Sequence, residues 1–280
     1  MGNAIATLRP GDHVCLAAAS DAEWFDAAVT LTAGGLRDHC KTILVTTIQP
    51  VERLHRRLAE RVPGYPAAAV AGHVEIAAGR ELYLSGGGFD GDRMIGIYAA
   101  AIDDSQQRGY AGLRVIADMA WAADQPLGER LADYETAVNR LFTTGWMAAI
   151  CQYDRRLFDD ATIEGVCSAH PIIDNGAAFR FRAVEEPPGL VLTGDLHRSN
   201  RRVLAEVLAP LADVPAALTI DATGVTFVGP EAAVMLVSLA RLRREQAQTT
   251  TVVCAYGLGA LLWKFDSTGA LTTRGPSAHD

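Results

Sequence analysis

Short apolar runs alternate with helical patterns over the first two thirds of the chain. The apolar runs have the length and composition of buried strands and cover residues 13–19, 42–47, 74–77, 113–117 and 146–153. The helical patterns cover residues 51–61, 92–108, 127–142 and 160–169, and a first helix begins near residue 21, after the Ser20–Glu23 capping box. This alternation predicts an α/β domain with a mostly parallel sheet and helices on both faces.

The pattern changes near residue 170, where turn-forming residues gather in His170-Pro171 and in Pro187-Pro188-Gly189. We place a domain boundary between them, which gives domains 1–177 and 178–280. The second domain has predicted strands at 179–184, 189–196, 217–221 and 250–255, and predicted helices at 200–211, 230–245 and 258–265. This mixed order predicts a small α/β domain.

Composition and charge narrow the classes of function. Of the 280 residues, 49% are hydrophobic and 21% are charged, as in folded soluble proteins, and a net charge of −8 disfavours nucleic acid and anionic lipid as partners. The longest apolar stretch, 232–240, is too short to cross a membrane, and the first ten residues show no secretory signal. The five scattered cysteines form no C-x-x-C pair, so we expect reduced thiols and a cytoplasmic protein.

A parallel sheet is a common nucleotide-binding scaffold, but the phosphate loop G-x-x-x-x-G-K-[ST] is absent. Another motif, Gly86–Gly91, matches G-x-G-x-x-G, and Asp118 ends the next predicted strand, where dinucleotide-binding domains place a ribose-binding acid. Asp90 and Asp92, however, put negative charge where a pyrophosphate would dock. A nucleotide- or dinucleotide-dependent enzyme that uses Gly86–Gly91 and Asp118 is therefore kept as the alternative, and a flexible glycine loop is favoured.

Aromatic and acidic residues near the ends of predicted strands form the candidate ligand site, because ligands of open α/β sheets bind beyond the carboxyl ends of the strands. Trp24, Trp121 and Tyr153 are predicted to line an apolar cleft, with Asp118 and Asp154 as its polar groups. The alternative is that the aromatic rings belong to the core and that Asp154 pairs with a neighbouring arginine.

His13 and Cys15 share one face of the first predicted strand and have side chains that bind metals. The sequence identifies no third ligand beside them, so no metal site is predicted. No G-x-S-x-G elbow is present, and His170 has no evident nucleophile partner. We therefore predict no catalytic residues and no cofactor.

Five motifs of the first domain occur in the order found in the MEDS domain, a sensory module of methanogens and methylotrophs. They are Gly11-Asp-His-Val-Cys15, Phe89-Asp-Gly-Asp-Arg93-Met, Leu113-Arg-Val with Asp118-Met-Ala-Trp121, Tyr134-Glu135, and Cys151-Gln-Tyr-Asp-Arg155. The resemblance spans about residues 8–173 and implies a RecA-like core with a degenerate phosphate loop. It also implies a small apolar or hydrocarbon-derived ligand, and with it His13 and Cys15 join the candidate ligand-binding residues. Alanines 17–19 stand where the family commonly has an aromatic residue.

The second domain resembles a STAS domain, the fold of anti-sigma-factor antagonists. Leu192–Leu196 with Asn200, and Leu218–Phe227, fit its second and third strands. Switchable members then carry Asp-Ser-Ser-Gly, whose second serine is phosphorylated at the start of a helix. This chain has Gly229-Pro230-Glu231-Ala232 at that place, so the phosphorylatable hydroxyl is absent.

The residues that replace the serine suit the beginning of a helix. Gly229 can serve as the N-cap, Pro230 fits the first helical position, and Glu231 lies near the positive end of the helix dipole. One interpretation is that Glu231 permanently imitates a phosphoserine with less charge; the other is that it only begins the helix. Thr223 and Thr226 provide hydroxyls in the predicted loop before this helix.

The sequence therefore predicts a non-enzymatic signalling regulator. Its first domain senses a small molecule, and its second binds a protein through Thr223, Thr226, Gly229 and Glu231. The partner that the resemblance implies is an anti-sigma factor or a histidine-kinase-like protein, and hence a role in transcription regulation. No nucleic acid or membrane partner is expected, and the sequence leaves a homodimer open.

Overall fold

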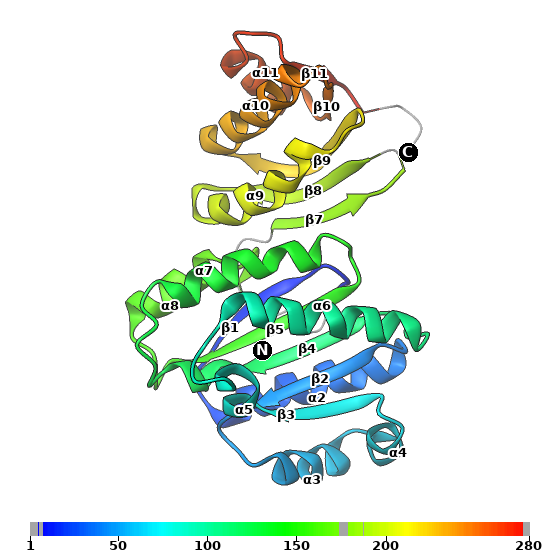
Figure 1. Cartoon of the computed structure of the whole chain (residues 1–280), viewed down its shortest axis with the longest axis vertical. Coiled ribbons are helices and arrows are strands. Elements are labelled where there is room, and N and C mark those ends of the chain that lie inside the picture. Colours follow the sequence, from blue (N-terminus) through cyan, green and yellow to red (C-terminus); the bar gives the residue numbers. More distant parts are fainter. Residues whose placement is uncertain (1–4, 6–7, 174–178, 187, 277–280) are drawn as a thin grey trace. The chain divides into compact units, whose positions relative to one another are not determined.

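The computed structural model describes residues 5, 8–173, 179–186 and 188–276 (Figure 1). The chain divides into two compact units, Met1–Gly176 and Ala177–Asp280. The predicted boundary between residues 177 and 178 falls outside the described residues, so its position stays a prediction.

The first unit is built on a six-stranded sheet in which all neighbouring strands are parallel. The strand order is β3-β2-β4-β5-β1-β6. The strands are β1 (His13–Ala18), β2 (Lys41–Thr46), β3 (Val74–Ala78), β4 (Leu113–Asp118), β5 (Met147–Asp154) and β6 (Ile172–Ile173). Nearly every residue of β1, β4 and β5 is buried, as expected for parallel strands that are covered on both faces. The predicted parallel sheet is confirmed.

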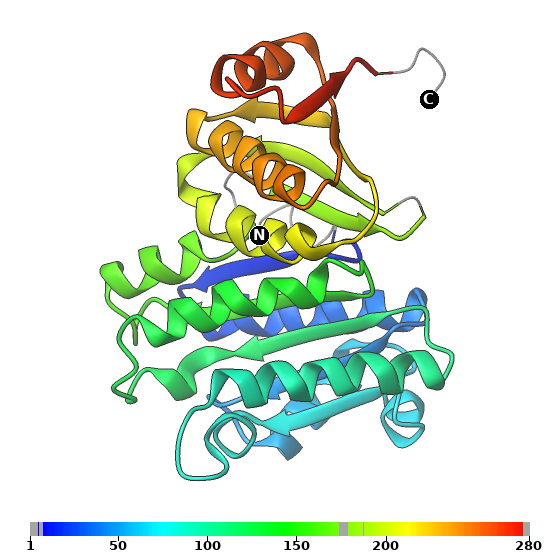
Figure 2. The ribbon, with the colours of Figure 1, turned by 45° about the horizontal axis from the view of Figure 1, so that its top comes forward.

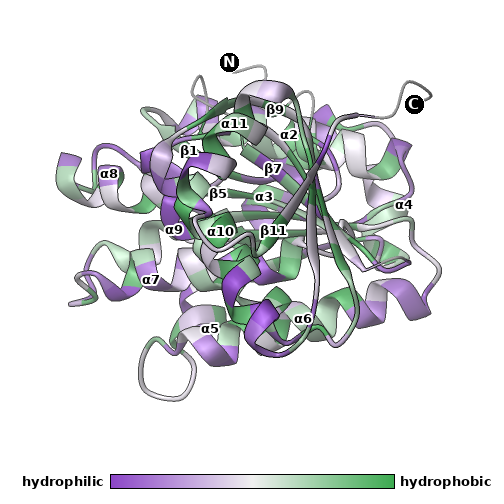
Figure 3. Ribbon diagram, turned by 90° about the horizontal axis from the view of Figure 1, so that it is seen from above, coloured by the Kyte–Doolittle hydropathy of each residue, from purple (hydrophilic) through white to green (hydrophobic). Residues whose placement is uncertain are grey.

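Helices cover both faces of this sheet. Figures 1 and 2 show α6 and α7 on one face and α2 on the other. The helices are α2 (Asp21–Arg37), α3 (Val51–Arg61), α4 (Tyr65–Val70), α5 (Gly79–Leu84), α6 (Gly91–Gln107), α7 (Arg130–Ala137) and α8 (Asp160–Ser168), with 3₁₀ turns at Met119–Ala122 and Val138–Phe142. In Figure 3, α7 and α8 carry both hydrophilic and hydrophobic residues, as helices with one face on a sheet do.

Local chemistry accounts for the placement of α2. The Ser20 hydroxyl accepts a hydrogen bond from the Glu23 amide at 3.3 Å, and the Glu23 carboxylate accepts one from the Ala19 amide at 2.8 Å, so the helix start is capped. Near its other end, a Cβ on Gly35 would lie 2.2 Å from the Thr42 hydroxyl. The glycine therefore allows the helix to approach β2 closely.

The second unit is built on a five-stranded mixed sheet with the order β11-β10-β9-β8-β7. Only β7 is antiparallel to its neighbour within this sheet. The strands are β7 (Phe179–Val184), β8 (Gly189–Leu196), β9 (Leu218–Val228), β10 (Thr250–Val253) and β11 (Leu271–Arg274). The helices are α9 (Arg201–Leu208), α10 (Pro230–Glu245) and α11 (Tyr256–Phe265), with 3₁₀ turns at Arg198–Asn200 and Ala209–Asp213. The predicted small α/β domain is confirmed.

One element of this unit differs from the prediction in a way that concerns the candidate partner residues. The strand predicted to end at residue 221 continues to Val228, so Thr223 and Thr226 lie in β9 and not in a loop. Pairing with β8 extends the strand, and the register of this pairing shifts between Val191 and Thr193 and again between Gly194 and Asp195.

No helix among the described residues has the length and apolar composition needed to cross a bilayer.

Candidate functional site

The carboxyl ends of β4 and β5 bring together four of the predicted ligand residues. Trp24, Asp118, Tyr153 and Asp154 line one small cavity. Its volume is about 10 Å³, which is room for about one water molecule. These side chains are packed against each other, and their role in ligand binding stays a prediction.

Asp118 is held by the backbone around it. Its Oδ2 accepts hydrogen bonds from the amides of Thr47 at 2.7 Å and Ile48 at 2.8 Å, and its Oδ1 accepts one from the Ala120 amide at 3.0 Å. Burial raises the pKa of this carboxyl, although the three amides act in the opposite direction. Asp118 therefore ties the turn after β2 to the end of β4.

Asp154 lies at the more exposed side of the same cavity. The guanidinium of Arg156 contacts both of its oxygens, at 2.9 and 2.6 Å, and this ion pair lowers the pKa of Asp154. The pairing matches the alternative reading of Asp154 in the sequence.

Trp121 does not line this cavity. Its indole stacks on the Tyr83 ring at 4.5 Å with an interplanar angle of 12°, and it lies 5.0 Å from the Phe89 ring. Trp121 thus belongs to an aromatic cluster that is shared with α5 and the segment before α6.

A larger cleft of about 480 Å³ opens between the N-terminal end of α6 and α7. The Phe89 ring meets the Tyr134 ring edge-on at 5.2 Å, and the Arg130 guanidinium donates to the Phe89 carbonyl at 3.0 Å. A Cβ on Gly91 would lie 3.3 Å from the Tyr134 ring, so this glycine lets the two helices approach. The lining residues are Phe89, Asp90, Gly91, Asp92, Ile95, Arg130, Asp133, Tyr134 and Ala137.

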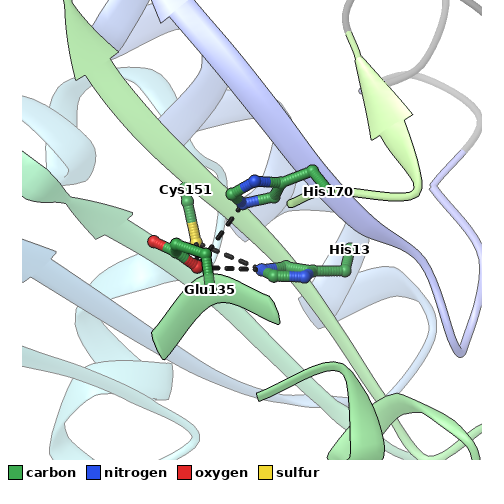
Figure 4. Close-up of side chains that lie close together, drawn as sticks. All are labelled: His13, Glu135, Cys151 and His170. Atoms are coloured by element: carbon green, nitrogen blue, oxygen red, sulfur yellow. Dashed lines mark hydrogen bonds and ion pairs between the residues drawn. The ribbon is translucent and has the colours of Figure 1, made fainter. Parts of the chain in front are cut away.

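Four side chains of the types that can bind a metal ion meet inside the same unit, beside β1 and β5 (Figure 4). We call His13, Glu135, Cys151 and His170 the buried polar cluster; their exposed fractions are 1%, 0%, 7% and 2%. They come from β1, α7, β5 and the turn after α8, respectively. His13 and Cys15, which the sequence places on one face of the strand, have different partners: His13 joins the cluster, whereas the Cys15 sulfur lies 3.2 Å from the Cys167 sulfur.

The atoms of the buried polar cluster that face each other form two long hydrogen bonds that involve the Cys151 sulfur and two histidine–carboxylate contacts. Glu135 Oε2 lies 3.5 Å from His13 Nε2 and 3.5 Å from His170 Nε2, and 3.6 Å from the Cys151 sulfur. His13 Nε2 also lies 3.4 Å from the Cys151 sulfur. The four facing atoms all lie within 4.8 Å of one another.

The polar atoms of His13, His170 and Glu135 that point away from the centre of the cluster each form a hydrogen bond with a neighbouring group. The Asn139 amide nitrogen donates to three backbone carbonyls, so its oxygen accepts from His13 Nδ1 at 3.0 Å. His170 Nδ1 donates to the Val166 carbonyl at 2.8 Å. Tyr153 donates to Glu135 Oε1. Both imidazoles therefore carry their proton on Nδ1 when neutral and present the Nε2 lone pair to Glu135.

Burial and neighbouring charge set the ionisation of the cluster. Burial lowers the pKa of His170 to about 4, so this ring is neutral at pH 7. Burial acts to raise the pKa of Glu135, but His170, His13 and Tyr153 together hold it below its usual value. Burial and the Glu135 charge raise the pKa of the Cys151 thiol.

In the second unit, the predicted partner residues lie around the start of α10. Gly229 precedes the helix in an extended conformation, Pro230 takes the first turn, and Glu231 is exposed beside it. Thr226 donates to Asp195 Oδ1 at 2.6 Å, and Thr223 donates to Asp221 Oδ1 at 2.7 Å. The Phe227 side chain next to them is 49% exposed.

Comparison with protein families decides the relationship of the first unit. The family model described as "MEthanogen/methylotroph, DcmR Sensory domain" (MEDS) matches residues 12–171, more than half of the chain. The chain belongs to the MEDS family. A second model, described as "Mlab, STAS domain", matches residues 179–258, so a STAS domain follows the MEDS domain. This order confirms the resemblance seen in the sequence and indicates a sensory or regulatory protein.

Other comparisons add little to this assignment. The KaiC-like protein PH0186 of Pyrococcus horikoshii OT3 is 11% identical, with a TM-score of 0.42 over 66% of this chain and 78% of that one. The DUF1998 helicase MrfA bound to DNA and AMPPNP is 10% identical, with a TM-score of 0.33 over 95% of this chain and 46% of that one. Both scores are too low to carry an argument. A search of curated proteins found no match.

The MEDS domain thus contains features that sequence reasoning missed. Glu135 and Cys151 lie in two of the motifs that carry the resemblance, yet nothing local indicates that both face His13. His170 does lie in the predicted turn, but its ring packs at 4.1 Å against the His13 ring, a contact that the sequence did not indicate. The cleft between α6 and α7 adjoins the glycine motif but was not predicted as a ligand site.

Proposed function

We propose that this chain is a non-enzymatic regulator whose MEDS domain receives a small-molecule signal and whose STAS domain binds a protein partner. The observation that carries the proposal is the cleft of about 480 Å³ between α6 and α7, which has the size of a small-molecule site. Phe89, Ile95 and Tyr134 form a largely buried apolar wall of the cleft, and Asp90, Asp92, Asp133 and Arg130 bring charged groups to it. This lining suits a small ligand that carries polar or charged groups beside an apolar part.

The test of ligand binding is native mass spectrometry of the full chain purified from its own host. We expect a retained small molecule, and we expect Ala137→Trp, which fills the cleft from α7, to abolish its retention. Ala100→Trp, on the exposed face of α6, is the matched control and should retain the molecule. Absence of any bound mass in the wild-type chain, or its equal retention by both variants, would contradict the proposal.

The alternative is a nucleotide- or dinucleotide-dependent enzyme that uses Gly86–Gly91 and Asp118. Two observations weigh against it. Both Asp118 oxygens already accept backbone hydrogen bonds, and the N-terminus of α6 is capped by Asp90, whose Oδ1 accepts from the Arg93 amide at 3.0 Å. Isothermal titration with NAD, ATP and S-adenosylmethionine separates the two functions, because micromolar binding of any of them would favour the enzyme.

For the STAS domain we propose docking on an anti-sigma factor or a histidine-kinase-like protein, with the chain acting in transcription regulation. STAS domains generally mediate protein–protein interactions, and the exposed Phe227 beside Glu231 provides an apolar contact next to a charge. Glu231 would act there as a permanent, weaker substitute for a phosphorylated serine. Ligand occupancy must then favour one arrangement of the domains, or of a homodimer, because a ligand shifts an equilibrium only through differential affinity.

Charge reversal at Glu231 tests this docking surface. We expect Glu231→Arg to weaken capture of the cognate partner about tenfold, which corresponds to about 1.4 kcal/mol for one reversed contact charge. Glu245→Arg, at the other end of α10, is the matched control and should bind as the wild type does. Equal pull-down by the wild type and by Glu231→Arg would show that the partner docks elsewhere.

The proposal places the protein in the cytoplasm. Its five scattered cysteines form no C-x-x-C pair and no disulfide framework in the sequence, which suits a reducing compartment.

A further inference from the structure

The facing atoms of the buried polar cluster are mostly hydrogen-bond acceptors, and they have too few donors among them. His13 and His170 direct lone pairs at a carboxylate oxygen, and the Cys151 thiol has one proton to donate among them. His170 Nε2 is fully buried and has no hydrogen-bond partner. Three acceptors that converge in a dry interior cost free energy unless a cation lies between them.

We propose that the buried polar cluster is a zinc site, with His13 Nε2, His170 Nε2, Glu135 Oε2 and the Cys151 sulfur as its four ligands. Ligands at zinc bond lengths of about 2.0–2.3 Å in a tetrahedron are separated from each other by about 3.3–3.6 Å. Four of the six pairs among these ligand atoms lie at 3.4, 3.5, 3.5 and 3.6 Å, and all four atoms lie within 4.8 Å of one another. Those four distances match the edges of a tetrahedral zinc site, and two nitrogens, one sulfur and one oxygen are a donor set that suits zinc and not magnesium or calcium.

Charge balance favours the same ion. A Zn²⁺ ion with a Glu135 carboxylate and a Cys151 thiolate has zero net charge, and the two neutral imidazoles add none. A neutral group is easier to bury than a net charge, and all four ligand side chains are buried.

The surroundings of the ligands resemble the outer shell of a metal site. Asn139 orients His13, the Val166 carbonyl orients His170, and Tyr153 holds the second oxygen of Glu135. Such contacts fix the tautomer of each imidazole and the direction of the carboxylate toward the ion. All four coordination positions are filled by protein, as in structural zinc sites, so the ion would join β1, α7, β5 and the turn after α8 and leave no position for substrate.

The direct test is the metal content of the full chain expressed with added zinc and then dialysed against a weak chelator. We expect about one zinc ion per chain, as one tetrahedral site predicts, and large losses in Cys151→Ser and His170→Gln. Cys15→Ser is the matched control, because Cys15 is a buried cysteine that lies on β1 outside the ligand set, and it should retain the zinc.

A spectroscopic measurement keeps the proposal testable if a variant does not fold. Wild-type protein refolded with Co²⁺ should show the visible bands of a tetrahedral ion together with a sulfur-to-cobalt charge-transfer band, which only the Cys151 ligand provides. A wild-type chain that folds without bound metal, with its cluster satisfied by a proton, would overturn the proposal. So would zinc content that is unchanged in both ligand variants, or a cobalt spectrum without the sulfur band.

Discussion

Replacing Arg243 by methionine is expected to destabilise the STAS domain by about 3–5 kcal/mol, because it orphans several buried carbonyls at once. The Arg243 side chain is fully buried in α10. Its guanidinium donates to the carbonyls of Leu211 at 2.6 Å, Val214 at 2.9 Å and Ala216 at 2.5 Å, and its Nε donates to the Thr250 hydroxyl at 3.1 Å. Methionine fills a similar volume but donates no hydrogen bond.

This arginine holds the segment between α9 and β9 in place against α10. The carbonyls that it accepts as partners lie in the 3₁₀ turn Ala209–Asp213 and in the irregular stretch that follows this turn. Because buried carbonyls need donors, one guanidinium replaces the backbone partners that the stretch lacks. Burial lowers the pKa of Arg243, yet its charge is retained at neutral pH because an arginine titrates far above it.

The measurement is chemical denaturation combined with hydrogen exchange read by mass spectrometry, which separates the STAS domain from the MEDS domain. Arg244→Met is the matched control, because Arg244 is exposed in the same turn and donates to the single carbonyl of Thr268. It should change the free energy of unfolding by less than about 1 kcal/mol. Equal destabilisation by the two variants would mean that the loss of charge at the end of α10, and not the buried network, is responsible.

Much of the fold was predictable because its signals are local. The bounds of α3 and α10 agree with the prediction, since a proline marks each start and an amphipathic pattern follows. The helices α4 and α5 were not predicted; each has six residues, too few for a periodic signal, and is stabilised by packing. The strand β11 is largely exposed and lacks an apolar pattern, so only its pairing with β10 defines it.

The buried polar cluster was only half visible in the sequence. Strand periodicity correctly indicated that His13 and Cys15 point to one face, and both do contact partners there. The partners of His13 lie more than one hundred residues away along the chain, as the separation of 126 residues to Asn139 shows. Periodicity carries no information at that distance, so the neighbours of His13 depend on the order of strands in the sheet.

For Asp118, the sequence predicted a ligand contact and did not indicate the backbone hydrogen bonds that the structure shows. Its place at the end of a strand predicted a ligand contact, but a strand end is also where turns expose unpaired backbone amides. A sequence does not show whether the carboxylate accepts hydrogen bonds from those amides or contacts a ligand. In the structure the amides of Thr47, Ile48 and Ala120 take both oxygens.

Asp118→Ala is therefore expected to destabilise the MEDS domain by about 2–4 kcal/mol, because three amides lose their acceptor in a site that holds about one water molecule. Asp118→Asn keeps one acceptor oxygen and should lose about half as much. Asp124→Ala is the matched control: that carboxylate is exposed and pairs with the exposed Arg80, so its loss should leave the free energy of unfolding nearly unchanged. Unfolding in denaturant, followed by hydrogen exchange, provides the comparison.

The same variants separate the two functions considered for this protein. If Asp118 bound a ribose, Asp118→Ala would lose nucleotide affinity and keep its stability, because a ligand-facing carboxylate has no backbone partners to abandon. If Asp118 joins the turn after β2 to the end of β4, the variant loses stability and the wild type binds no nucleotide. An Asp118→Ala chain that unfolds at the wild-type denaturant concentration would contradict the structural role and favour the enzyme.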